Sequence, residues 1–263
     1  MGVTSEGVFT LTVPSYPRGI ILGDESEPRQ TIHEESSTQQ YTLGTQLWYG
    51  DGRKFRYASS GAALSKAYMT CSATNTPNCV AEAQGTSGVN VEIGDMEITI
   101  DVTNASGITD DLYAEGYVSV DTSTGIGDIY KIVACKLLTT TTARLLLETK
   151  IRTAWAAGTT ISLLRNRFRD VVVFPTTATQ PATGIPLIDV TSGYYFWAQT
   201  KGEAPCYVDT GDTIVLGEMV GKPGTHTVAG ACGVPTAGTS DVWGKVRYVV
   251  AAASVAVIDL NLD

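Results

Sequence analysis

The residues of this chain that could do chemistry are few, and their spacing does not assemble them. The 263 residues include only two histidines and five cysteines, and no two cysteines form a Cys-x-x-Cys pair. A structural zinc site needs four nitrogen or sulfur ligands at recognisable spacing, so none is predicted. Asp110 and Asp111 are oxygen ligands of the kind that a hard cation prefers, but we expect a solvated pair in a turn.

Motifs of nucleophilic enzymes, zinc proteases and phosphate-binding loops are also missing from the sequence. It contains no Gly-x-Ser-x-Gly, no His-Glu-x-x-His and no Gly-x-x-x-x-Gly-Lys-[Ser/Thr]. We expect His33 and His226 at the surface, and the cysteines as free thiols, although a bridge between Cys71 and Cys79 is sterically feasible. A carboxylate pair for glycoside hydrolysis stays open, because the fold sets its spacing. The sequence therefore predicts no enzyme, no metal and no cofactor.

The net charge of −9 argues against binding to phosphate backbones over the whole surface. Charged residues make up 17% of the chain, below the roughly 25% of an ordinary soluble domain, so part of the surface is expected to be covered by another chain. One basic segment stands out, with Arg165, Arg167 and Arg169 at alternate positions. In a strand they share one face. A solvated face with local carboxylate partners, a contact between subunits and a nucleic-acid contact are all open interpretations.

Alternating apolar and polar residues predict strands along most of the chain. Asp51-Gly52 between two β-prone runs predicts a hairpin, and strand patterns recur over 95–102, 117–120, 128–135, 143–148, 160–164 and 171–174. We expect an all-β fold with an extended N-terminal arm (1–40), a central β-barrel or sandwich domain (41–175), a linker (176–186) and a smaller C-terminal β module (187–263). No stretch approaches the ~20 apolar residues that span a bilayer, so no membrane contact is predicted.

Two segments are candidate contacts with other chains. The polar arm has a short β-prone stretch, and it is either a mobile terminus or an arm that orders on a neighbouring subunit. Its candidate interface residues are Val8, Phe9, Leu11 and Val13. Near the C-terminus, a dense aromatic run in a chain of low charge predicts part of a subunit contact, and its residues are Tyr194, Tyr195, Phe196 and Trp197.

Three groups of motifs resemble virion proteins of tailed bacteriophages. The first is Leu-Gly-Thr at 43–45, followed by Asp-Gly-Arg-Lys-Phe-Arg-Tyr-Ala at 51–58. The second is Leu-Tyr-Ala-Glu-Gly-Tyr-Val at 112–118, with Gly-Ile-Gly-Asp-Ile-Tyr-Lys-Ile at 125–132. The third is Gly-Tyr-Tyr-Phe-Trp-Ala-Gln-Thr-Lys-Gly at 193–202. The resemblance covers residues 41–263 and consists of turn and packing residues.

The resemblance implies a capsid decoration (cement) protein, a homotrimer that binds the phage major capsid protein. Such a protein is made in the host cytoplasm and resides on the outer surface of the virion. A head-fibre or tail-associated virion protein is the alternative of the same structural class. A virion carbohydrate-binding module or glycan hydrolase is the alternative of another class.

Overall fold

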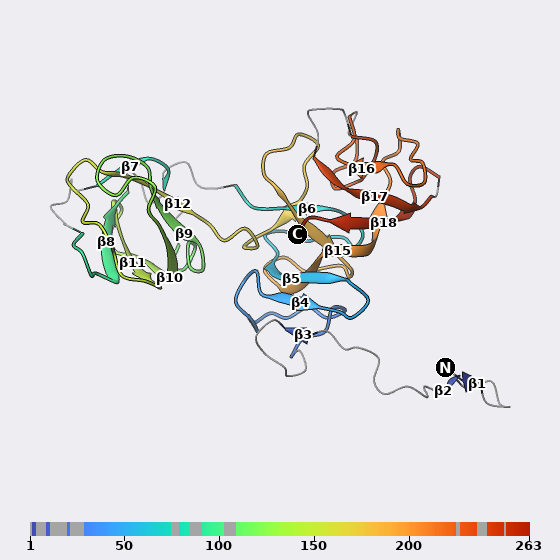
Figure 1. The fold of residues 1–263 in the computed structure, drawn as a ribbon, viewed down its shortest axis with the longest axis horizontal. Helices are drawn as coiled ribbons and strands as arrows, with labels where there is room; N and C mark the ends of the chain where they lie inside the picture. The colour runs from blue at the N-terminus through green and yellow to red at the C-terminus, as the bar shows by residue number, and fades with distance from the viewer. Residues whose placement is uncertain are drawn as a thin grey trace.

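The computed structural model describes residues 29–74, 79–84, 91–102, 109–224, 227–235, 241–249 and 251–263, together with three two-residue strands nearer the N-terminus. The fold is all-β, as the sequence predicts, and the described residues contain no α-helix. Figure 1 shows two lobes. None of the described segments forms a helix of membrane-spanning length and hydropathy.

The smaller lobe, here called the half-barrel, is a curled six-stranded sheet (Figure 1). Its strands lie in the order β7-β12-β9-β10-β11-β8. Their bounds are β7 Glu82–Ala83, β8 Glu97–Asp101, β9 Tyr117–Val120, β10 Ile129–Leu137, β11 Thr142–Leu147 and β12 Thr160–Leu164. Alternate side chains point inward, so that Ile100, Ile132 and Leu145 are fully buried in one core. The period of two seen in the sequence thus places one face of every strand in the core.

The two ends of this sheet are bridged by one side chain. Gln84, directly after β7, donates from Nε2 to the Asp101 carbonyl at 2.9 Å and accepts from the Asp101 amide at 2.9 Å. Its Nε2 also donates to the Glu82 carbonyl at 3.1 Å. The Gln84 amide therefore satisfies backbone groups of Asp101 on the side of β8 that pairs with no other strand of the sheet.

The larger lobe, here called the main lobe, is built on a ten-stranded sheet. Its strands are β3 Ile20–Ile21, β4 Gln46–Trp48, β5 Lys54–Ser59, β6 Thr70–Cys71, β13 Val172–Val173, β14 Ala182–Pro186, β15 Tyr195–Tyr207, β16 Met219–Gly221, β17 Val242–Tyr248 and β18 Val255–Asn261. The principal order is β13-β6-β14-β15-β18-β17-β16. The hairpin of β4 and β5 joins this sheet because β5 pairs with β15.

The strand pairing corrects the predicted division of the chain. The segment 176–186 is no linker, because its last five residues form β14, which is buried throughout and pairs with β6 and β15. Strands before and after the half-barrel share one sheet, with Tyr57 opposite Trp197. The half-barrel is therefore an insertion in the main lobe, between β6 and β13, which are themselves paired. Local patterns cannot reveal a pairing between segments so far apart in the chain.

The predicted arm is partly corrected as well. Its last residues, from Arg29 onward, lie on the main lobe of the same chain, where Ser36 and Tyr195 exchange backbone hydrogen bonds of 3.0 and 2.8 Å. Gln30 is buried, and its Nε2 donates to the Tyr195 carbonyl at 2.8 Å. Nearer the N-terminus, β1 Gly2–Val3 pairs with β2 Phe9–Thr10. Val8, Leu11 and Val13 lie outside the described residues, so their predicted contact stays a prediction.

Candidate interface surfaces

The arginine segment does not form the strand face that the alternation predicts. β12 ends at Leu164, and the next residues turn, with the Arg169 amide bonded to the Asn166 carbonyl at 3.0 Å. The Asn166 side chain favours the turn, since its Oδ1 accepts from the Phe168 amide at 2.8 Å. Alternation alone missed this turn, whose signal in the sequence is the asparagine.

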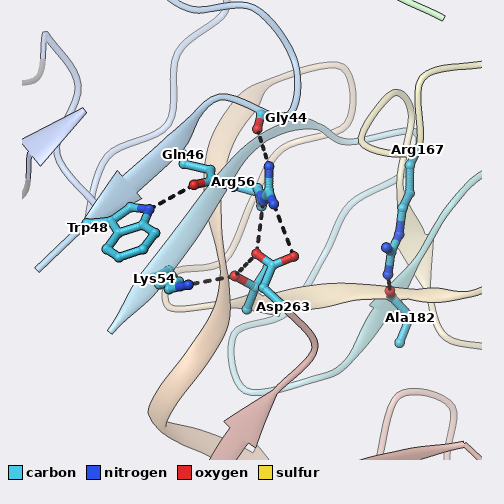
Figure 2. Close-up of polar contacts among 9 residues, drawn as sticks. Gly44, Gln46, Trp48, Lys54, Arg56, Arg167, Ala182 and Asp263 are labelled. Atoms are coloured by element: carbon cyan, nitrogen blue, oxygen red, sulfur yellow. Dashed lines mark hydrogen bonds and ion pairs between the residues drawn. The ribbon is translucent and has the colours of Figure 1, made fainter. Parts of the chain in front are cut away.

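The three arginines hold the connection between the lobes. Arg165 pairs with Asp170 at 3.9 Å, which is a local carboxylate partner of the expected kind. Arg169 donates to the Ala114 carbonyl of the half-barrel at 3.4 Å, whereas Arg167 donates to the Ala182 carbonyl of β14 (Figure 2). Their side chains therefore bind different parts of the same chain instead of forming one common face.

The aromatic run at the start of β15 belongs largely to the core. Phe196 and Trp197 are 0% and 1% exposed, so the prediction that they contact another subunit is wrong. Residues 29–41 cover this part of the sheet, and Trp197 donates from Nε1 to the Gln30 carbonyl at 2.9 Å. The Tyr57 ring lies 5.0 Å from the Trp197 ring, at the distance of an edge-to-face aromatic pair. Tyr194 and Tyr195 are half-buried, and their predicted contact stays a prediction.

Near the end of the chain, a carboxylate is held on the outward side of the main sheet. Arg56 donates from Nε and Nη2 to the two oxygens of the Asp263 side chain, at 2.9 and 3.2 Å, and from Nη1 to the Gly44 carbonyl (Figure 2). Thr200 donates to the same carboxylate at 2.9 Å. Burial alone would raise the pKa of Asp263, but the hydrogen bonds from Arg56 and Thr200 outweigh burial and lower it.

The outward side of the main sheet is a charged surface, here called the sheet face. It runs from the β4–β5 turn across β5, β15 and β18 to β17, and strand register brings charged residues side by side: Glu203 lies opposite Asp259, which lies opposite Lys245. Its cations are Arg53, Lys54, Arg56, Lys201, Lys245 and Arg247. Its carboxylates are Asp51, Glu203, Asp259 and Asp263. These six cations and four carboxylates give the sheet face an excess of two positive charges, although the chain as a whole has a net charge of −9.

Two adjoining hollows mark the sheet face. One has a volume of about 590 Å³ and lies between the β4–β5 turn and β15, and the other, of about 350 Å³, extends toward the edge strand β16. Lys201 and Asp259 line both. The second hollow is also lined by Met219 and Val242, which are exposed apolar side chains. Cations next to exposed apolar groups give this surface both charge and apolar area.

The half-barrel has a contrasting outward surface, here called the barrel face. Val133 and Leu146 are exposed apolar side chains on β10 and β11, and Leu146 lies opposite Glu97 of β8. A hollow of about 290 Å³ beside them is lined by Glu97, Asp110 and Asp111, with Lys136 and Arg144 as its cations. Residues 79–164 contain eleven Asp and Glu against five Lys and Arg, which is a net charge of −6.

The groups with perturbed ionisation elsewhere are structural. Burial alone would raise the pKa of Asp209, but hydrogen bonds from Thr227, Val228 and Gly211 lower it to about 2. These bonds anchor the loop that precedes β17. All five cysteines are buried free thiols, as expected, and burial raises the pKa of Cys71 to about 11, which disfavours the reactive thiolate. Among the described residues, no group of three His, Cys, Asp or Glu side chains could hold a metal ion.

The tryptophans bear on the sugar-binding alternative. Trp155, Trp197 and Trp243 are buried, whereas Trp48 on β4 is 41% exposed. The Lys54 ammonium lies 3.9 Å from the centre of the Trp48 ring and covers one of its faces. The exposed tryptophan is thus partly occupied by its own chain.

Comparison of the chain with family models, with curated proteins and with solved structures found no match. The fold and its surfaces define an all-β protein of two lobes, with a neutral main lobe and an acidic inserted half-barrel. Sequence reasoning missed both the sheet face and the barrel face. The alternation in β15 and β18 marks the polar side of each strand, but only the strand order brings those sides together.

Proposed function

We propose that this chain is a structural virion protein that binds the outer surface of a bacteriophage capsid and cements neighbouring capsomers, as a homotrimer and without catalysis. The proposal rests on the motifs that resemble tailed-phage capsid decoration proteins. The observation that carries it is that the first and third motif groups, far apart in sequence, meet in one sheet. β5 of the first pairs with β15 of the third over residues Tyr195 to Lys201.

The exposed surfaces support a role in binding a protein surface. Large apolar side chains are exposed on both lobes, including Ile129 at 55% and Met219 at 59%. Exposed apolar side chains next to charged groups are typical of sites that contact other proteins. A protein that binds only the assembled shell lowers the free energy of that shell relative to separated capsomers. Repetition of the contact by the symmetry of the capsid adds avidity.

Binding to capsids that lack the chain tests this function. The purified protein should sediment with such capsids up to a fixed number of copies per capsomer, and it should raise the temperature at which the shells open. Capsids of an unrelated phage are the control. Imaging of labelled virions separates the alternatives, because decoration covers the shell, whereas a fibre or tail protein lies at one place. No sedimentation with the capsids, or label confined to the tail, would contradict capsid decoration.

A further inference from the structure

The part of the sheet face beside β16 and β17 lies at the opposite end of the molecule from the barrel face, and the two lobes differ in charge. In Figure 1, β16 and β17 of the main lobe and β8 and β11 of the half-barrel mark the two ends. The half-barrel carries a net charge of −6, whereas residues 29–78 and 165–263 of the main lobe contain twelve Asp and Glu and twelve Lys and Arg. The β16–β17 end of the sheet face and the barrel face are far apart within one chain, so they are available to different copies of it.

The sheet face has cations that its own chain leaves unmatched. Arg53, Arg56 and Arg247 each form an ion pair with a carboxylate of the same face. Within the described part of the chain, no carboxylate forms such a pair with Lys201 or Lys245. Both lysines line the hollow that also exposes Met219 and Val242. A complementary surface therefore has to supply carboxylates beside apolar side chains.

The barrel face offers this combination. Glu97 lies opposite Leu146 in the sheet, and Glu148 directly follows the end of β11. Both glutamates are exposed, and so are Leu146 and Val133. Glu97 pairs with Arg144 at 3.0 Å, whereas no cation in the described residues pairs with Glu148. The face thus presents carboxylates at the rim of an apolar strip.

We propose that copies of this chain associate by seating the barrel face of one copy on the sheet face of the next. Because the two faces are different surfaces of the same chain, the contact is head-to-tail, and it closes into a ring when the rotation per copy permits. A ring of three is the trimer of the proposed function, so the inference rests on that self-association but not on capsid binding. Charge complementarity steers the encounter, and the apolar strips become buried at the centre.

Paired charge reversals test the contact in solution, without capsids. K201E/K245E reverses the sheet face, and E97K/E148K reverses the barrel face. The variant with all four substitutions makes every contact complementary again. K66E/K222E is the matched control, since it changes the net charge by the same amount as the first variant and neither residue lines the two hollows. Sedimentation velocity at low and high salt measures the association, and circular dichroism checks that each variant is folded.

We expect the wild-type chain and the control to associate, and each double reversal to weaken association about tenfold or more at low salt. The variant with all four substitutions should again associate with copies of itself. A wild-type chain that stays monomeric at micromolar concentration and low salt would overturn the proposal. The proposal would also be overturned if the variant with all four substitutions associated no more strongly than either double variant. Capsid binding is measured separately. A chain that associates with itself but does not bind capsids would contradict the proposed function and leave the proposed contact between copies standing.

Discussion

Replacement of Gln84 should open the half-barrel along the edge of β8. In Gln84→Ala, the amide and carbonyl of Asp101 and the carbonyl of Glu82 each lose a hydrogen bond. Gln84 and Asp101 are 5% and 6% exposed, so water does not readily replace those bonds. Each buried hydrogen bond that is lost costs about 1 kcal/mol, so the half-barrel should lose about 3 kcal/mol of stability. Backbone amides whose hydrogen exchange requires unfolding of the half-barrel should then exchange about a hundredfold faster, because each 1.4 kcal/mol is about a factor of ten.

Hydrogen exchange measured by mass spectrometry on peptides from β8 and from β15 tests this magnitude. β8 should lose protection while β15 keeps it. Gln39→Ala is the control, because the Gln39 amide makes its hydrogen bonds at an exposed position. In Gln84→Glu, a carboxylate faces the carbonyls of Glu82 and Asp101, which accept hydrogen bonds from the Gln84 amide in the wild type. A protonated carboxyl group can donate a hydrogen bond, so the increase in hydrogen exchange should become smaller at acid pH. Exchange of β8 in Gln84→Ala at the wild-type rate would refute the proposed closure.

Three further predictions concern the main lobe. Asp209→Asn should cost about 2 kcal/mol at neutral pH. The pKa of Asp209 is lowered to about 2 in the folded protein, whereas in the unfolded chain it is about 4. Ionised Asp209 therefore contributes its full stabilisation to the fold above pH ~4, and this contribution is lost as the pH falls through about 2. Thermal unfolding against pH should therefore show the wild-type advantage fading below pH 4. Arg56→Ala should cost about 1 kcal/mol and speed hydrogen exchange near Asp263, and unchanged exchange would contradict its anchoring role. Gln30→Ala should expose residues 29–40 to limited proteolysis, and cleavage at the wild-type rate would show that the Gln30 bonds do not hold this segment.

The strands of the half-barrel were the most predictable part of the fold. The expected strands over 117–120 and 160–164 are β9 and β12, with the same bounds. The side chains of β9 alternate between the core and the surface, as Val118 and Val120 show, because this strand has one buried face. In β12 three consecutive residues, 161–163, are buried. Such a signal is local, so a single sequence contains it in full.

Pairing between distant strands was not predictable in this way. Nothing in residues 54–59 indicates that their partner begins at Tyr195, and this pairing is what makes the half-barrel an insertion. β14 was missed because the segment that contains it is rich in Thr, Ala and Pro, which is typical of a linker. Gly184 is required there, since a Cβ would lie 2.7 Å from the Gln199 carbonyl oxygen, and its φ of 149° is in a region that other residues rarely adopt.

The insertion of the half-barrel between two paired strands sets an order of events during synthesis. The half-barrel is one continuous segment, so all of its strands have been made before β15 leaves the ribosome. The hairpin of β4 and β5 has to wait for its partner, from Ser59 to Tyr195, which takes on the order of 10 s at ~5–20 residues per second. During that interval β15 is absent, so Phe55 and Tyr57, which are fully buried in the finished protein, are not yet packed against it. The nascent main lobe is therefore the part of the chain most exposed to aggregation.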